Sequence, residues 1–275
     1  MTGKISVLMG IYNCEETLVS AVRSIQNQTY GNWELILCDD GSADGTFALA
    51  EQLAKKDGRI VLLKNERNLG LNKTLNRCLA AATGEFVARM DGDDESLLHR
   101  FETQIGFLNA HPEFQMVSSP MILFDETGEW GYTTVPENPN GADIVAGTAI
   151  NHAPVMLRKA ALETVGGYSE EEFTRRVEDV DLWIRMYAAG FRCHNIQQPL
   201  YRMRNDRNAL NRRKYRYRIH SVRVRLRGCK LLGLGPISYL KAIRPMINGL
   251  VPAKLRQMIR KQQGNNYEEN PFSDP

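Results

Sequence analysis

The stretch Glu85-Phe86-Val87-Ala88-Arg89-Met90-Asp91-Gly92-Asp93-Asp94 decides the fold of this chain. Its first six residues are mostly apolar and predict a buried strand. The strand ends on three carboxylates within four residues. In α/β sheets, ligands bind outside the carboxyl ends of the strands. This stretch therefore predicts a strand that delivers acidic side chains to a ligand site.

The residues before this stretch alternate between apolar runs typical of strands and segments with helical periodicity. Such alternation indicates βαβ units and a mostly parallel sheet flanked by helices. The expected strands are Ile5–Ile11, Glu34–Cys38, Arg59–Leu63 and Glu85–Met90, and the expected helices are Thr17–Gln26, Thr46–Lys55 and Leu71–Ala82. The predicted fold class is therefore α/β and Rossmann-like.

The pattern after residue 95 is less regular, with Gly- and Pro-rich turns near residues 128–141. We expect a helix at Leu97–Ala110, a strand at Val155–Arg158, a short helix at Lys159–Thr164 and a helix at Val180–Ala189. These elements complete the body of the protein.

The composition is that of an ordinary globular protein, with 43% hydrophobic and 24% charged residues among 275. It excludes a collagen-like or disulfide-rich chain. The five cysteines are scattered, without a CxxC pair, so we expect reduced thiols in a cytosolic protein and no zinc site. The first apolar run is too short for a signal peptide, and Leu231–Pro252 is interrupted by Lys241, Arg244, Pro236 and Pro245, so we expect no transmembrane helix.

Charge is distributed very unevenly along the chain. Residues 201–261 contain 18 Lys and Arg against one acid, Asp206, whereas the rest contains 17 Lys and Arg against 31 Asp and Glu. Such a basic tail predicts contact with an anionic surface, either nucleic acid or lipid headgroups. Apolar residues recur at helical spacing within it and predict one face of an amphipathic helix: Tyr215, Ile219, Val222, Leu226 and Cys229. The alternative is a charged, solvated helix that packs on the body.

Two acidic pairs follow expected strands. Asp39 and Asp40 come after the second strand, where a carboxylate can accept hydrogen bonds from a nucleotide, although Asp, Gly and Ser also form plain turns. Asp91 and Asp93 enclose Gly92. Clustered carboxylates repel one another unless a cation lies between them, and Mg²⁺ or Mn²⁺ prefers oxygen ligands. The alternative for Asp91–Asp94 is a solvated turn that caps the next helix.

A third acidic cluster, Glu178-Asp179, lies at the start of an expected helix. Acids in a first helical turn commonly cap free N–H groups. The functional interpretation makes Asp179 a general base that takes the proton of an acceptor hydroxyl. No Ser/His or Cys/His signature suggests a covalent intermediate.

In this order, the motifs resemble family 2 glycosyltransferases with the A-type (GT-A) fold, which act with inversion. The resemblance spans roughly residues 4–204. The matching stretches are Ile5–Asn13, Ser24–Tyr30, Asp39–Thr46, Asn68–Asn76, Ala82–Asp94, Gly166–Tyr168 and Glu178–Trp183.

The resemblance implies a role for each site residue. Tyr12 and Asp39 would contact the nucleobase, and Asp40 and Lys73 would lie along the nucleotide. The Asp91–Asp93 pair would surround the ribose, the metal ion and the diphosphate. Asp179 would be the catalytic base with Glu178 beside it, and His152 would lie near donor and acceptor unless it is a hydrogen-bonded core histidine.

The resemblance also implies an organisation of the chain. Residues 1–95 would form the nucleotide-sugar-binding half and residues 96–205 the acceptor-binding and catalytic half of one domain. Residues 206–261 would form the basic helical tail, and the polar residues 262–275 are expected to be disordered. A histidine that often follows the closing strand of the family is Asp206 here. No Gln-x-x-Arg-Trp motif is present, which favours a single transfer over polymerisation.

The sequence thus predicts a transferase dependent on Mn²⁺ or Mg²⁺ that moves a sugar, by default from UDP, to a saccharide acceptor. The basic tail favours a lipid-linked acceptor at the inner face of a membrane, because each Lys or Arg near anionic lipid contributes about 1 kcal/mol. One rival is a nucleic-acid-binding protein with Tyr215 and Tyr217 stacking on bases, which leaves the acidic motifs unexplained. The other is an inactive nucleotide-sugar-binding protein.

Overall fold

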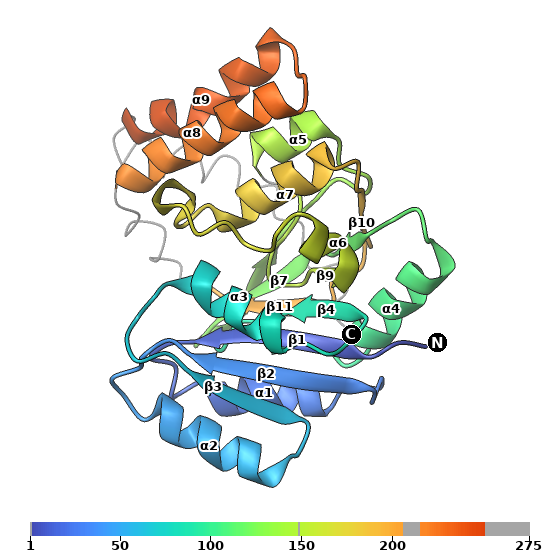
Figure 1. Ribbon diagram of the computed structural model, residues 1–275, viewed down its shortest axis with the longest axis vertical. Coiled ribbons are helices and arrows are strands. Elements are labelled where there is room, and N and C mark those ends of the chain that lie inside the picture. Colours follow the sequence, from blue (N-terminus) through green and yellow to red (C-terminus); the bar gives the residue numbers. More distant parts are fainter. Residues whose placement is uncertain (1, 148, 206–214, 251–275) are drawn as a thin grey trace.

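The computed structural model describes residues 2–147, 149–205 and 215–250. Its centre is a seven-stranded sheet in the order β10-β6-β9-β4-β1-β2-β3 (Figure 1). The strands are β1 Ile5–Ile11, β2 Trp33–Asp39, β3 Ile60–Lys64, β4 Phe86–Arg89, β6 Met116–Ser118, β9 Met156–Arg158 and β10 Cys193–Asn195. Only β9 runs antiparallel to its neighbours in this sheet.

Alternation along the strands builds a separate core on each face of the sheet. Val7 and Met9 of β1 face α1, α2 and α4, whereas Leu8 faces α3, α6 and α7. Successive side chains of a strand point to opposite faces, so an apolar run such as β1 is buried on both sides. The helices are α1 Leu18–Gln26, α2 Thr46–Lys56, α3 Leu71–Ala81, α4 Arg100–Ala110, α5 Gly141–Ala146, α6 Lys159–Thr164 and α7 Glu178–Ala188.

A second, four-stranded sheet lies beside the first, in the order β5-β11-β7-β8. Its strands are β5 Glu95–Ser96, β11 Tyr201–Arg204, β7 Met121–Asp125 and β8 Gly128–Tyr132. Strand β11 pairs antiparallel with β5 and parallel with β7. It therefore brings residues 201–204 next to the acidic loop that follows β4.

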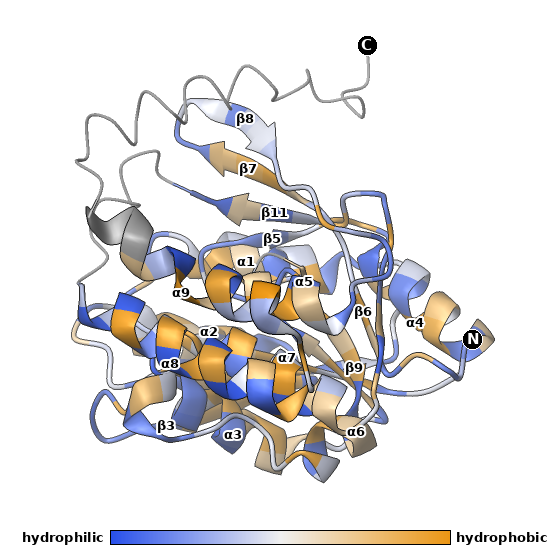
Figure 2. Cartoon of the chain, turned by 90° about the horizontal axis from the view of Figure 1, so that it is seen from above, coloured by the Kyte–Doolittle hydropathy of each residue, from blue (hydrophilic) through white to orange (hydrophobic). Residues whose placement is uncertain are grey.

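The basic tail forms a helical pair, α8 Arg216–Leu231 and α9 Pro236–Leu250. Figure 2 shows the two helices side by side, with hydrophobic and hydrophilic residues interleaved along α8. Helix α8 packs on α7, where a Cβ on Gly228 would come within 2.5 Å of Ile184 Cδ1. Val224, absent from the predicted apolar face, joins the main core, while Tyr215 and Ile219 are about half exposed. Amphipathic α8 thus covers the body.

The expected α/β class with a mostly parallel sheet is confirmed, and all five cysteines are free. Two boundaries differ from prediction by more than one residue: α4 begins at Arg100, because β5 and a turn precede it, and α7 begins at Glu178. No helix among the described residues is long and apolar enough to span a bilayer. Asp206 and residues 262–275 lie outside the described residues. The division into a donor half and an acceptor half stays a prediction.

Candidate active site

A cavity of about 670 Å³ opens at the carboxyl ends of β1, β2 and β4. Ligand pockets in proteins typically measure about 300–1,000 Å³, so this cavity has room for a nucleotide sugar. Its lining residues come from segments 10–17, 68–74, 91–93 and 175–178, together with Asp40, Asp44 and Arg204. The cavity thus lies where a parallel sheet is expected to bind its ligand.

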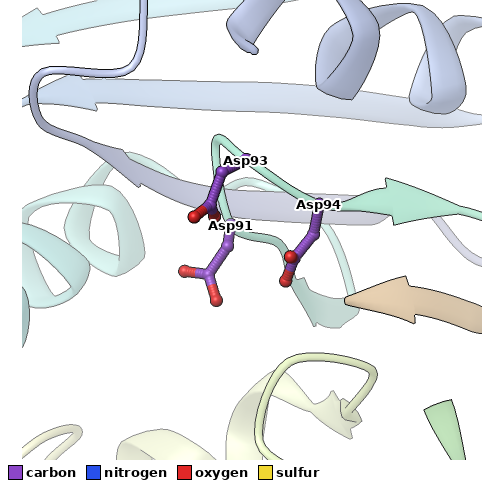
Figure 3. A group of neighbouring side chains, drawn as sticks. All are labelled: Asp91, Asp93 and Asp94. Atoms are coloured by element: carbon purple, nitrogen blue, oxygen red, sulfur yellow. The ribbon is translucent and has the colours of Figure 1, made fainter. Parts of the chain in front are cut away.

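The acidic loop after β4 gathers three carboxylates (Figure 3), of which Asp91 and Asp93 line the cavity. One carboxylate oxygen from each of Asp91, Asp93 and Asp94 lies within 4.8 Å of the others. Asp93 opens to solvent, Asp91 is half-buried and Asp94 is buried. The predicted pair Asp91–Asp93 is therefore joined by a third carboxylate, Asp94.

Strand β11 holds this loop in place from the other end of the chain. The Tyr201 hydroxyl accepts a hydrogen bond from the Asp91 amide at 3.1 Å, and Asp94 Oδ1 accepts one from the Arg204 amide at 2.7 Å. At the middle of the loop, a Cβ on Gly92 would lie 2.9 Å from Cys14 Sγ. Glycine is therefore the residue that lets the loop pack against the segment after β1.

Buried cations lie behind the carboxylates. The Arg89 guanidinium forms an ion pair with Asp91, and this charge holds the pKa of Arg89 above its usual value despite complete burial. Behind it, fully buried Arg100 donates to the Arg89 carbonyl at 2.9 Å. Burial lowers the pKa of Arg100 to about 10.

The loop nevertheless carries excess negative charge. Desolvation by neighbouring protein atoms and the charge of Asp91 raise the pKa of Asp93. Burial raises the pKa of Asp94 well above its ordinary value. Asp94 Oδ2 is buried with no hydrogen-bond partner among the described residues. An orphaned carboxylate oxygen beside two others is a donor set that suits a hard divalent cation.

The other predicted pair is held by protein contacts. Asp39 is fully buried, does not line the cavity, and accepts hydrogen bonds from the amide and hydroxyl of Ser42. Asp40 lines the cavity, but its two oxygens accept from the amides of Leu69 and Gly70 at 2.8 and 2.9 Å. Both side chains therefore shape the loops around the cavity.

The remaining predicted nucleotide contacts are divided. Tyr12 lines the cavity and is 49% exposed. Lys73 is exposed on α3 and does not line the cavity, whereas its neighbours Asn72 and Thr74 do. Asn13, next to Tyr12, has a positive φ of 48° and accepts from the Ala43 amide at 2.9 Å. A strained residue of this kind is common at functional sites.

The third acidic pair starts α7, next to the cavity. Glu178 lines the cavity, and burial, helped by the charge of Asp179, raises its pKa. Asp179 is half-buried and does not line the cavity. His152 also lies outside the lining; its Nε2 is 2.8 Å from the Tyr168 hydroxyl, and burial lowers its pKa well below the usual value. Of these three residues, the structure brings only Glu178 into one cavity with Asp93.

Sequence reasoning missed three arginines that line the cavity: Arg175, Arg176 and Arg204. Arg204 reaches the cavity because β11 pairs with β5 and β7. The irregular sequence near residue 200 does not reveal this pairing. Arg175 and Arg176 immediately precede the Glu178-Asp179 pair. Two adjacent arginines almost directly before an acidic pair form an abrupt change of charge along the sequence. This local pattern could have marked them as candidate site residues.

Comparison with known proteins identifies the family. The model of "Glycosyl transferase family 2" matches residues 6–163. The chain is 42% identical to EpsE of Bacillus subtilis (strain 168), a protein named as a glycosyltransferase, over 97% of this chain and 96% of that protein. It is 29% identical to the Escherichia coli UDP-Glc:alpha-D-GlcNAc-diphosphoundecaprenol beta-1,3-glucosyltransferase WfaP, over 70% of this chain and 73% of that protein.

The fold is also that of a solved glycosyltransferase. The structure of the mannosyltransferase PcManGT from Pyrobaculum calidifontis, in complex with GDP-Man and Mn²⁺, superposes with a TM-score of 0.66 at 15% identity, covering 98% of this chain and 82% of that one. The strand order, the acidic loop after β4 and the family match all indicate the same family of proteins. This chain therefore belongs to glycosyl transferase family 2 and has the GT-A fold.

Proposed function

We propose that this protein transfers a sugar, with inversion, from a nucleotide diphosphate sugar to a hydroxyl of a lipid-linked saccharide. The observation that carries the proposal is a nucleotide-sized cavity whose lining includes Asp91, Asp93 and Glu178. UDP is the proposed nucleotide, because the relative WfaP is named for a UDP-sugar donor. Synthesis of a cell-surface polysaccharide is the setting in which such a transfer fits.

Asp91, Asp93 and Asp94 are the residues that would hold Mn²⁺ or Mg²⁺. The clustered oxygens and the orphaned Asp94 Oδ2 fit a hard cation, and the PcManGT complex contains Mn²⁺. A bound cation would supply neutralisation of the charge that grows on the departing nucleotide diphosphate. Around it, Arg89 forms an ion pair with Asp91, and the Tyr201 hydroxyl accepts a hydrogen bond from the loop backbone.

Asp179 is the proposed general base, with Glu178 beside it. Direct displacement with inversion needs one base and no protein nucleophile. Both residues lie in the first turn of α7, and burial together with the charge of Asp179 raises the pKa of Glu178. Two isosteric variants decide between them, Asp179→Asn and Glu178→Gln.

The base should lose about 100-fold or more in kcat on amide substitution, because general-base catalysis contributes about 10²–10⁴. We expect Asp179→Asn to show this loss and to bind UDP normally. Full activity of Asp179→Asn together with an inactive Glu178→Gln would assign the base to Glu178 instead.

Helix α9 is the proposed membrane contact. Ile237 and Leu240 are 71% and 67% exposed, and exposed Lys241 and Arg244 share their helical face at spacings of three and four. An apolar stripe flanked by cations complements an anionic bilayer. The protein would then act at the inner membrane face, where a lipid-linked acceptor is found.

Vesicle flotation tests this surface. The full chain should float with vesicles of phosphatidylglycerol and phosphatidylcholine but not with phosphatidylcholine alone. An Ile237→Asp, Leu240→Asp double variant should stay in solution, while Val61→Asp, at an exposed valine on β3, should float normally. Equal flotation of both variants would remove α9 from the proposal.

The overall proposal is tested by metal-dependent transfer. Nucleotide sugars are screened for release of nucleotide diphosphate with Mn²⁺, with Mg²⁺ and with EDTA, with and without a polyprenyl-diphosphate-linked sugar. Acceptor-dependent release that EDTA abolishes supports the proposal. Tight, salt-sensitive RNA binding with no such release from any donor would favour the nucleic-acid rival.

A further inference from the structure

The segment that enters α7 carries a feature that neither the metal loop nor the catalytic pair explains. A short 3₁₀ turn, η1 Glu172–Thr174, precedes Arg175 and Arg176. Thr174 is fully buried and receives a hydrogen bond from the Asn72 side chain of α3 at 3.3 Å. The start of the segment is thus tied to a helix that lines the cavity.

After this anchor, the chain turns sharply over two arginines. Arg176 has a φ of 68°, a left-handed conformation that non-glycine residues rarely adopt. Strained backbone of this kind clusters at ligand-binding sites. The turn places both Arg175 and Arg176 in the cavity lining, directly before Glu178.

The two guanidinium groups lack a carboxylate partner. Both side chains are exposed, and neither takes part in an ion pair or a side-chain hydrogen bond with any residue in the described part of the chain. The nearby acid Glu171 instead pairs with Arg227 of α8 at 3.0 Å. The cavity lining therefore includes two positive charges that form no ion pair within the described residues.

The arginine turn is continuous with the basic tail. Figure 1 shows this segment between α8 and α3. Arg223 of α8 lies over the Phe173 ring at 4.1 Å, and the charges of Arg175 and Arg176 help lower the pKa of Tyr217. Positive charge thus runs from the tail helix into the cavity.

Resting on the proposed function, we propose that Arg175 and Arg176 bind a phosphate or diphosphate group of the substrate. Arginine presents several N–H donors in a fork that matches phosphate oxygens. The donor and a lipid-linked acceptor both contain this group. The pair closely precedes the proposed catalytic pair and lies next to α8 of the basic tail, which is the part of the chain expected to face a lipid-linked acceptor, so the acceptor diphosphate is the assigned ligand.

Direct binding tests the assignment without turnover. Two probes are titrated into the full chain by calorimetry in excess Mg²⁺: UDP, and geranyl diphosphate added after saturating UDP. The variants are Arg175→Gln and Arg176→Gln. The matched control is Arg192→Gln, an exposed arginine outside the cavity lining. Circular dichroism and thermal melting verify that each variant is folded.

We expect each variant to weaken geranyl diphosphate binding about tenfold, since a hydrogen bond to a charged group contributes about 1.5–3 kcal/mol. UDP affinity should change less than twofold, and Arg192→Gln should bind both probes normally. Weaker UDP binding with unchanged geranyl diphosphate binding would overturn the acceptor assignment and place the donor diphosphate at the pair. Unchanged affinity for both probes would overturn the phosphate site itself.

The same titrations separate this inference from the proposed function. If the wild-type chain fails to bind UDP, the nucleotide-sugar proposal fails. Geranyl diphosphate titrated alone then still reports on the arginine pair. If UDP binds and EDTA-sensitive transfer occurs while the variants bind geranyl diphosphate normally, the proposed function stands and only the arginine assignment is lost.

Discussion

Replacing Gly92 with alanine tests whether close packing holds the acidic loop in its working position. Gly92 lies between two of the clustered carboxylates, and its carbonyl accepts a hydrogen bond from the Thr17 hydroxyl at 2.9 Å. An added Cβ would lie 2.9 Å from Cys14 Sγ and 3.1 Å from Ile11 Cγ2. The first contact is closer than real Cβ atoms adopt, so the loop or the β1 end must shift.

Overpacking of this kind costs about 1–3 kcal/mol. For a chain of this size, each kcal/mol lowers the melting temperature by about 2–4 °C. A shift of the loop also separates Asp91 and Asp93 from their current positions. We therefore expect Gly92→Ala to unfold at lower urea concentration and to lose most of the rise in melting temperature that UDP with Mn²⁺ gives the wild type.

A second substitution makes the test specific. Cys14→Ala removes the sulfur atom that the new methyl group would meet, so the double variant should recover about 1–2 kcal/mol relative to the sum of the single effects. Thr46→Val, which breaks the hydrogen bond from the Cys14 amide without touching Gly92, should show no such recovery. A Gly92→Ala protein as stable as the wild type, with normal UDP and Mn²⁺ binding, would refute the packing argument.

Three further outcomes follow from buried groups. Glu34, whose carboxylate accepts hydrogen bonds from Lys4, Ser6 and Thr83, has a pKa lowered to about 2, so its stabilisation is complete above its ordinary pKa near 4.5 and is lost as the pH falls toward 2. Urea unfolding should place Glu34→Gln about 1.5–3 kcal/mol below wild type at pH 7, with the gap narrowing below pH 4.5 and closing only as the pH falls to about 2. Arg100→Met should destabilise the fold by about 2–5 kcal/mol, because it leaves the Arg89 carbonyl without its buried donor, and unchanged thermal melting would contradict this. Burial raises the pKa of the Cys14 thiol to about 11. The thiol reagent 5,5′-dithiobis(2-nitrobenzoate) should therefore react slowly with the native protein at pH 8, and more slowly still when UDP and Mg²⁺ are present. Rapid modification of one thiol would show that Cys14 is not shielded.

The first half of the fold is readable from sequence because its strands are buried on both faces. Ile5–Ile11 is an unbroken apolar run, and its predicted bounds equal those of β1. Helix α3 begins at Leu71 and Lys159–Thr164 forms α6 as predicted, since local periodicity and turn residues mark those elements. The second sheet was not predicted as a unit: β5 has two residues, and its pairing with β11 joins segments more than a hundred residues apart.

The site shows the same division between local and distant information. Asp91 and Asp93 are recognisable because their spacing and position after a strand are local properties. Contact with the cavity depends on packing, which is why Asp39 and Lys73 do not line it while Arg175 and Arg204 do. Nothing local to Asp40 indicates that both its oxygens bind the backbone of the loop before α3.

The hold of β11 on the acidic loop has a consequence for the order in which the protein matures. Residues 91–94 leave the ribosome long before Tyr201 and Arg204, their hydrogen-bonding partners. A nascent chain that ends soon after β4 therefore contains the three carboxylates but lacks the hydrogen bonds to β11 that position their loop. The loop can acquire these two hydrogen bonds only after residues 201–204 have joined the second sheet, so a chain truncated before residue 201 lacks the contacts that position its carboxylates.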